Sequence, residues 1–206
     1  MKYIKITFLP IFFLFLVSTI FSQITDLGNP ISWNGKLSNI HIPTEIMPSF
    51  DRSQIDAEDL INDALKDRPW RFGFKYNVNL TTKNSGVWTN LPNGDKLWQL
   101  SIECNNALTI NLLLENYDLP KGASLYLYDI DKTNKVGAYT SRNNRKDGEL
   151  GTELVHGEKI IVEYYEPASV ETSGYFKIAN VIHGYRNLSQ VQDNFLRALN
   201  SSGDCN

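Results

Sequence analysis

A strict alternation of apolar and polar residues in residues 98–104 constrains the fold of this chain more than any other feature. Every second residue from Trp98 to Cys104 is apolar and the residues between them are polar, which is the period of a β-strand with one buried face. Residues 108–114 repeat this period after a short polar break. We expect these two strands to be neighbours in one sheet, and their apolar faces need a second sheet to cover them.

Other segments of the chain have the same strand-like pattern and are separated by turns rich in Gly, Pro, Asn and Asp. We assign the covering sheet to residues 125–129, 159–165 and 175–182. Further strands are expected at residues 72–80, 87–91, 136–140 and 152–155. This total of about eight or nine short strands predicts an all-β fold, a jelly-roll-like antiparallel β-sandwich that spans residues 70–186.

The segment before the sandwich, residues 23–69, is expected to be an extended arm followed by a short N-terminal helix. Three prolines prevent a lasting helix before residue 50. The helix is predicted for residues 54–66, with Asp51 or Ser53 as its N-cap and Pro69 after its end.

The segment after the sandwich, residues 187–206, is expected to be a helical linker. Apolar residues recur every three to four positions over residues 189–200, which predicts a C-terminal helix, and Ser201, Ser202 and Gly203 then break it.

The first 22 residues have the pattern of a secretory signal peptide. Two lysines precede an apolar run over residues 6–21, and cleavage is predicted between Ser22 and Gln23. The alternative is a membrane anchor, but the run is short for a membrane span. We therefore expect a secreted protein, extracellular or periplasmic, with no membrane association after removal of the signal.

Charge and size narrow the classes of function. The net charge is −3 and no run of Lys or Arg is present, so the basic surface of a nucleic-acid-binding protein is not expected. With 206 residues, of which 42% are hydrophobic, the chain suffices for one domain with appended segments.

The two cysteines have different settings. Cys104 is in phase with the apolar residues of its strand and is expected to be a buried free thiol. Cys205 stands one residue from the end of the sequence and has no evident partner in the chain, so a disulfide partner outside this sequence is expected.

No motif for catalysis or metal binding stands out. The three histidines, His41, His156 and His183, accompany no nucleophile-elbow or similar serine motif, and no His and Cys have the spacing of a zinc site. No cofactor is therefore expected. A calcium ion is a weaker alternative, with oxygen ligands from loop residues that follow the predicted strands: Asp129, Asp131, Asn134, Asp147 and Glu149.

Aromatic residues leave a second function open. A secreted sandwich with exposed aromatic side chains can stack them on sugar rings, although Trp98 and one of the two phases of paired tyrosines are expected in the core. The candidates are Trp33, Trp70, Trp88, Trp98, Tyr126, Tyr128, Tyr164 and Tyr165.

Five short motifs, taken in order, resemble the N-terminal pro-region of secreted bacterial lysyl-endopeptidase-like, trypsin-type serine proteases. They are WQLSI at 98–102, LPKGASLYLY at 119–128, VGAYT at 136–140, EYYEP at 163–167 and VIHGYR at 181–186. The tail SGDCN at 202–206 looks like the start of the mature catalytic domain of these proteases. The resemblance covers about residues 70–206.

The resemblance implies a non-catalytic pro-region that assists the folding and latency of a downstream serine protease domain, its partner. It places the catalytic His, Asp and Ser after this sequence, so no catalytic residue is expected here, and the chain is either a fragment of a precursor or a stand-alone relative. We place the processing junction between Arg197 and Cys205, at the segment that includes Ser201, Ser202 and Gly203. The alternative function is a secreted carbohydrate-binding β-sandwich module.

Overall fold

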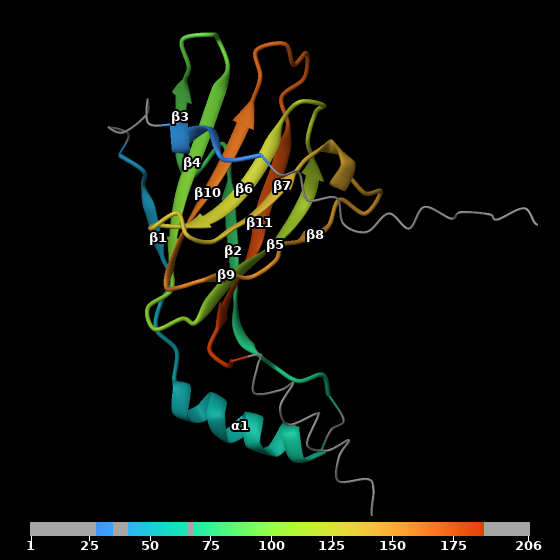
Figure 1. The fold of residues 1–206 in the computed structure, drawn as a ribbon. Helices are drawn as coiled ribbons and strands as arrows, with labels where there is room; N and C mark the ends of the chain where they lie inside the picture. Colours follow the sequence, from blue (N-terminus) through green and yellow to red (C-terminus); the bar gives the residue numbers. More distant parts are fainter. Residues whose placement is uncertain (1–27, 35–40, 66–67, 188–206) are drawn as a thin grey trace, which may run out of the picture.

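Two β-sheets stacked face to face form the body of the molecule (Figure 1). The structure, a computed structural model, describes residues 28–34, 41–65 and 68–187. The signal peptide, the predicted C-terminal helix, Arg197, the Ser-Ser-Gly junction and Cys205 lie outside these residues. The sequence-based prediction of a two-layered β-sandwich with an N-terminal helix is confirmed.

The larger sheet has the strand order β1-β4-β10-β6-β7, and β3 also pairs with β4, on the same edge as β1 and opposite β10. All its pairs are antiparallel except β1 with β4. Its strands are β1 (Thr44–Ile46), β3 (Val87–Asn90), β4 (Lys96–Glu103), β6 (Ser124–Asp129), β7 (Lys135–Tyr139) and β10 (Lys159–Glu166). We call it the six-stranded sheet.

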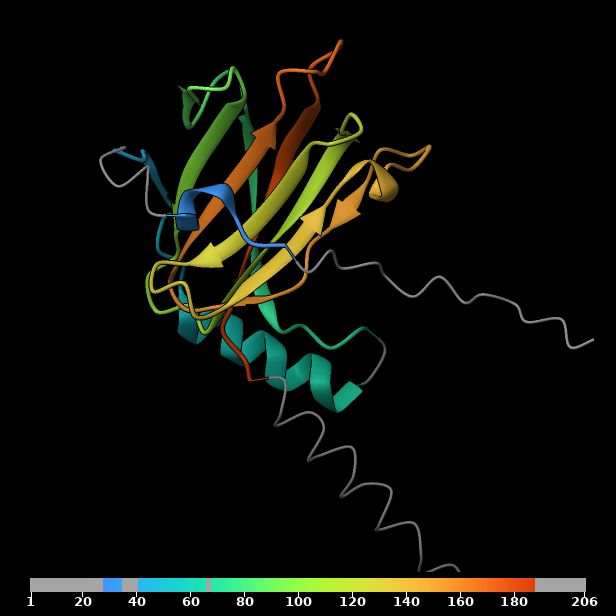
Figure 2. The same ribbon diagram turned by 45° about the horizontal axis from the view of Figure 1, so that its top comes forward.

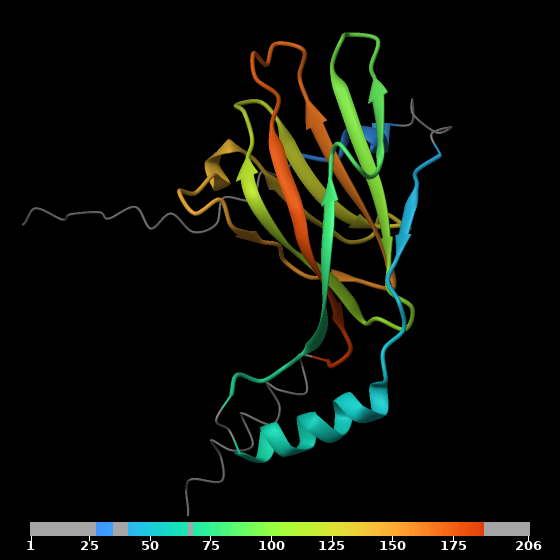
Figure 3. The same cartoon turned by 180° about the vertical axis from the view of Figure 1, so that it is seen from behind.

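The smaller sheet has the order β2-β11-β5-β8, and β9 also pairs with β5. All its pairs are antiparallel, and Figure 3 shows it from its own side. Its strands are β2 (Gly73–Thr81), β5 (Thr109–Asp118), β8 (Leu150–Gly151), β9 (Val155–His156) and β11 (Tyr175–Gly184). Outside the sheets, the structure has one α-helix, α1 (Arg52–Leu65), and two 3-10 helices, η1 (Ile31–Asn34) and η2 (Ser141–Asn143), among the described residues.

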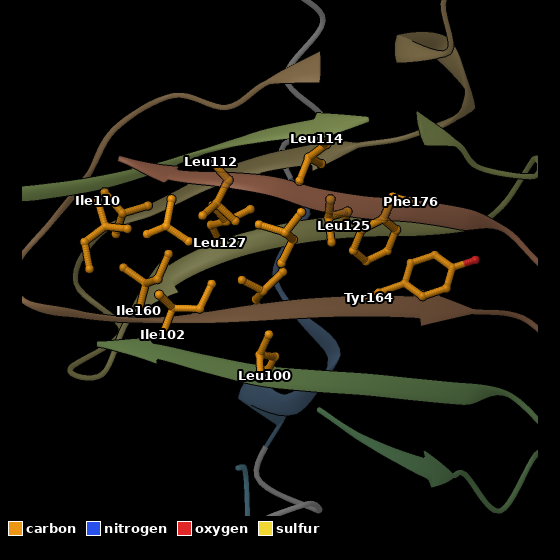
Figure 4. Packing of buried hydrophobic residues seen from close by; sticks show 14 of the residues in the cluster. Leu100, Ile102, Ile110, Leu112, Leu114, Leu125, Leu127, Ile160, Tyr164 and Phe176 are labelled. Carbon is orange, nitrogen blue, oxygen red and sulfur yellow. The ribbon is translucent and has the colours of Figure 1, made fainter. Parts of the chain in front are cut away.

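The core lies between the sheets and is built from the apolar phase of each long strand (Figure 4). Leu100 and Ile102 of β4 and Leu112 of β5 are fully buried, as their alternation predicts. Phe176 of β11 stacks edge to face on Tyr164 of β10, with ring centroids 5.5 Å apart. Cys104 is buried and free, as predicted, and burial raises the pKa of its thiol to about 12.

The predicted pairing of the strands is wrong in one respect. β4 and β5 are not neighbours in one sheet but face each other across the core, and β6 and β10 join β4. The reason lies in the short connection between them, whose backbone bonds to both layers. The N–H of Cys104 donates to the carbonyl of Glu158, and the N–H of Leu108 donates to the carbonyl of Gly184 at the end of β11. The chain thus crosses from one sheet to the other before β5 begins, which leaves Leu108 about half exposed.

Two further segments differ from their predictions. The arm is not uniformly extended, because it contains the 3-10 helix η1. Residues 152–154 are not a strand: the Thr152 hydroxyl accepts a hydrogen bond from the N–H of Leu112 in place of a strand carbonyl. α1 begins at Arg52, two residues earlier than predicted, and Asp51 is its N-cap, since the Asp51 carboxylate accepts from the N–H of Gln54.

Candidate functional site

α1 lies across one end of the sandwich, where β2 begins and β11 ends (Figures 1 and 3). Asp59, on the inner face of α1 and only 4% exposed, holds it there. Its carboxylate accepts hydrogen bonds from the guanidinium of Arg71 and from the hydroxyl of Tyr185, each at 2.7 Å. Arg186 pairs with Asp63 one turn further along the helix, and this hydrogen bond raises the pKa of Arg186 above its ordinary value.

A second face of α1 is apolar and exposed. Leu60, Ile61 and Leu65 are 76%, 60% and 64% exposed, respectively. The described chain leaves the sandwich at Asn187, directly after the Arg186 that is paired to α1. Because large exposed apolar groups that cluster on one element mark interaction sites, we define these three residues as the helix face.

The outer face of the six-stranded sheet is covered by residues 28–34, which include η1 and which we call the strap (Figure 2). The strand register brings polar side chains together beneath it. Glu163 on β10 lies between Gln99 on β4 and Tyr126 on β6. Two residues along, Ile161 lies between Ser101 and Tyr128 in the same way.

Glu163 is fully buried and is the centre of a hydrogen-bond network with the strap. Its carboxylate accepts from the amide of Gln99 at 3.1 Å and the hydroxyl of Tyr128 at 2.7 Å. Ser32 of the strap donates both its hydroxyl and its backbone N–H, at 2.5 and 3.2 Å. No cation pairs with Glu163 within the described ranges, so neutral donors alone compensate its burial.

Aromatic contacts hold the strap as well. Trp33 packs edge to face on Tyr128 with ring centroids 5.4 Å apart. The ammonium of Lys135 on β7 donates to the side chain of Asn29 at 2.7 Å and to the carbonyl of Gly28, and it lies 5.7 Å from the ring of Tyr126. The strap is thus pinned at Ser32, at Trp33 and at its start.

An open groove of about 520 Å³ runs beside the strap, over β6, β7 and the turns that flank them. Among the described residues its lining contains no Asp or Glu, but it contains Lys121 and Arg142. The tyrosines in the lining are Tyr126 and Tyr165. The other lining residues are Gly28, Asn29, Ile31, Gly122, Ala123, Ser124, Ala138, Thr140 and Ser141.

We expect the exchange of Glu163 for glutamine to lower the free energy of unfolding by about 1–3 kcal/mol. The NH2 group of the glutamine would face the N–H and O–H groups that donate to the carboxylate, so these donors would lose their acceptor. A double-mutant cycle with Ser32→Ala, measured by urea denaturation, tests the contact. The two effects should be strongly non-additive; additivity within about 0.5 kcal/mol would show that the strap does not stabilise this carboxylate.

His183, near the end of β11, lines a small pocket of about 150 Å³ near the base of α1. It is 5% exposed and contacts the ring of Phe50 edge to face at 5.0 Å. Burial disfavours the imidazolium and, with the nearby positive charge of Arg52, lowers the pKa of His183, while the backbone of Asn106 and the charge of Glu158 oppose this shift.

This lowered pKa predicts a pH-dependent stability. Since the unfolded state takes up the proton at a higher pH, stability is lost as the pH falls through the ordinary value of 6.5, with a slope of up to about 1.4 kcal/mol per pH unit. Denaturation between about pH 7.5 and about pH 5.5 should show this slope in the wild type and in His156→Gln, an exposed control. A His183→Gln variant with an undiminished slope would contradict the assignment.

The other predicted candidates are dispersed. His41 and His156 are exposed; His41 precedes β1 of the six-stranded sheet, and His156 is on β9 of the smaller sheet. The Asp129 carboxylate accepts hydrogen bonds from Thr133 and Asn134 of its own turn. Asp147 pairs with Arg145 in another loop, and no group of three or more His, Cys, Asp and Glu residues in the described chain is placed to hold a metal ion.

The aromatic candidates divide among four environments. Trp98 and Tyr164 are in the core, which confirms the core prediction for Trp98 and one tyrosine phase. Trp88, on the edge strand β3, is 40% exposed, and Trp70 lies under the guanidinium of Arg186. The remaining four lie on the strap side of the six-stranded sheet: Trp33, Tyr126, Tyr128 and Tyr165.

The residues that sequence reasoning missed are Glu163, Ser32 and Asp59. Glu163 and Asp59 occupy polar positions of a strand and a helix, and such positions are usually solvated. The sequence contained one signal for Glu163. The outward-facing positions of its strand and of the neighbouring strands carry unusually large side chains: Gln99, Glu163, Tyr126 and Tyr128.

Comparison with known proteins assigns no family to the chain. No known protein family matches the sequence. Among solved structures, the insecticidal crystal protein Cry2Aa is similar at 8% sequence identity, with a TM-score of 0.25. The match covers 57% of this chain and 19% of that protein, and at this TM-score it carries no argument about fold or function.

None of the helices in the described ranges has the length and apolar character needed to cross a membrane.

Proposed function

We propose that this chain is the non-catalytic pro-region of a secreted, trypsin-type serine endopeptidase and that it assists the folding and latency of that protease through protein contact. The observation that carries the proposal is the position of the helix face: Leu60, Ile61 and Leu65 are exposed on the helix to which Arg186 is paired where the described chain ends. The described chain therefore ends at the helix that carries this apolar surface, and this position supports a contact with a domain that follows in the chain.

The positions of the resembling motifs support this proposal. WQLSI lies in β4, LYLY in β6, EYYE in β10 and VIHG in β11, and these segments contribute much of the buried core. The resemblance is therefore carried largely by segments that build the sandwich.

We also propose that the sandwich is a jelly roll. The orders β2-β11-β5-β8 and β4-β10-β6-β7 support this, since two such four-stranded layers arise when two Greek keys fold over each other. The helical linker over residues 187–206, with cleavage between Arg197 and Cys205, belongs to the same proposal. Secretion through the predicted signal peptide is part of it too.

An in-trans refolding assay tests the function. A denatured lysine-specific, trypsin-type protease domain is diluted with and without this chain, and both the yield of active protease and its inhibition by excess chain are measured. The wild type should raise the yield and inhibit the product, and Leu60→Glu, Ile61→Glu and Leu65→Glu combined should weaken the inhibition by about tenfold or more.

The matched control is a variant with Leu108→Glu and Ile130→Glu, two apolar residues that are about half exposed elsewhere on the sandwich. It should inhibit as the wild type does. A wild-type chain with no effect on refolding or activity would refute the proposal. Retention of the chain on a polysaccharide, together with this lack of effect, would favour the carbohydrate-binding module instead.

A further inference from the structure

We propose that the groove beside the strap is a binding site for a carbohydrate that bears carboxylate or sulfate groups. This site is distinct from the helix face, and the proposal does not depend on the pro-region function. It rests on the shape of the groove, on its unpaired cations and on the aromatic side chains in its lining.

The strap and the six-stranded sheet form the walls of the groove. Its volume, about 520 Å³, falls within the range of small-molecule sites. One wall is the strap, fixed by the bond from Lys135 to Asn29. The strap approaches the sheet so closely that a Cβ on Gly28 would lie 2.8 Å from the hydroxyl of Tyr126, so a residue without a side chain suits this contact.

The charges in the groove select an anion. Neither Lys121 nor Arg142 forms an ion pair with another described residue. Both are exposed, and the groove lining, as described, has no carboxylate to neutralise them. Arginine offers paired donors to carboxylate or sulfate oxygens. Because the chain as a whole carries a net charge of −3, attraction of a polyanion must come from this local pair and not from the overall charge.

The remaining lining suits a sugar. Tyr126 and Tyr165 stand on the adjacent strands β6 and β10, on the same outward face. Tyr165 is partly exposed and can contact a sugar ring, whereas Tyr126 is only 6% exposed and is packed in a buried cluster with Tyr128. Aromatic side chains with a polar group bind ligands that have both apolar and polar surfaces, as sugar rings do. Ser124, Thr140 and Ser141 add hydroxyls along the same groove. The Tyr165 hydroxyl donates to the Asp95 carboxylate, and burial together with this hydrogen bond raises the pKa of Tyr165 to about 12.

Affinity gel electrophoresis of the full chain tests the proposal, with polygalacturonate as the acidic probe and hydroxyethylcellulose as the neutral probe, at about 0.15 M salt. Polygalacturonate should retard the wild type and hydroxyethylcellulose should not. Lys121→Ala and Arg142→Ala should each raise the dissociation constant about tenfold. Their thermal denaturation should match that of the wild type, since neither side chain has an ion pair to lose.

The matched control is Arg145→Ala, which removes the same charge three residues away, outside the groove lining and from a pair with Asp147. It should change the dissociation constant by less than about twofold. The proposal is overturned if polygalacturonate does not retard the wild type or if Arg145→Ala weakens binding as much as Arg142→Ala. Equal retardation by the neutral polymer would overturn it too.

Discussion

Replacement of Trp98 by alanine is expected to lower the free energy of unfolding by about 3–5 kcal/mol, a large part of the stability of a typical domain. Trp98 is fully buried and packs edge to face on Phe176 at 5.6 Å. Its indole N–H donates to the carbonyl of Ser85 at 2.8 Å, so the substitution also leaves this carbonyl without its donor. Urea denaturation monitored by circular dichroism measures the loss.

Trp88 provides the matched control, because it is the direct cross-strand partner of Trp98 but lies on the edge strand β3 and is 40% exposed. Trp88→Ala should cost only about 1 kcal/mol. Equal losses for the two variants would contradict the assignment of Trp98 to the core. A Gly86→Ala variant should also be destabilised, which gives a further check on the packing of Trp98. The new Cβ would lie 2.5 Å from the Trp98 ring, and residue 86 has a φ of +69°.

The core could be predicted from the sequence because burial in a sandwich follows the period of the strand. Leu100 and Ile102 are apolar at every second position, and a change of phase would expose them. The pairing of strands could not be predicted in this way. Alternation says which face of β4 is buried but not which strand bonds to its edges, and this choice depended on the backbone bonds of residues 104–108.

The contact between the strap and Glu163 could not be predicted, because its residues are far apart in the chain. Ser32 and Glu163 are 131 residues apart, and no local pattern joins them. An outward-facing Glu in a strand is usually solvated, so the sequence alone favours exposure. The two cations of the groove could not be predicted as a pair either, because Lys121 and Arg142 come from separate turns that only the fold brings to one groove.

The helix face and the groove occupy different parts of the molecule. α1 lies at the end of the sandwich where β11 stops, whereas the strap and groove lie on the outer face of the six-stranded sheet (Figures 1 and 2). A protein contact confined to α1 would therefore leave the groove open to a sugar. Variants of the two surfaces should act independently, as expected of sites with no shared residues.

Replacement of Asp59 by alanine is expected to lower the free energy that holds α1 against the sandwich by about 3–5 kcal/mol. The substitution removes a buried carboxylate that pairs with the guanidinium groups of Arg71 and Arg186. Arg71 and Arg186 lose their pairs with Asp59 and keep Glu58 and Asp63 as their only acidic partners, and Tyr185 loses its acceptor. With 14 residues, α1 is too short to be stable alone, so it should unfold before the sandwich does. In urea, the far-ultraviolet helical signal should then be lost ahead of the near-ultraviolet signal of the core.

Asp56→Ala is the control for this prediction. Asp56 is on the same helix and pairs with Arg52, but its side chain is 53% exposed, so its removal should cost only about 0.3–0.5 kcal/mol. If Asp59→Ala shifts the helical transition no more than Asp56→Ala does, then Asp59 does not anchor α1. If α1 is the protease contact, Asp59→Ala should also weaken inhibition in the refolding assay while Asp56→Ala does not. The anchor links the two measurements because the helix face exists only while α1 is folded against the sandwich.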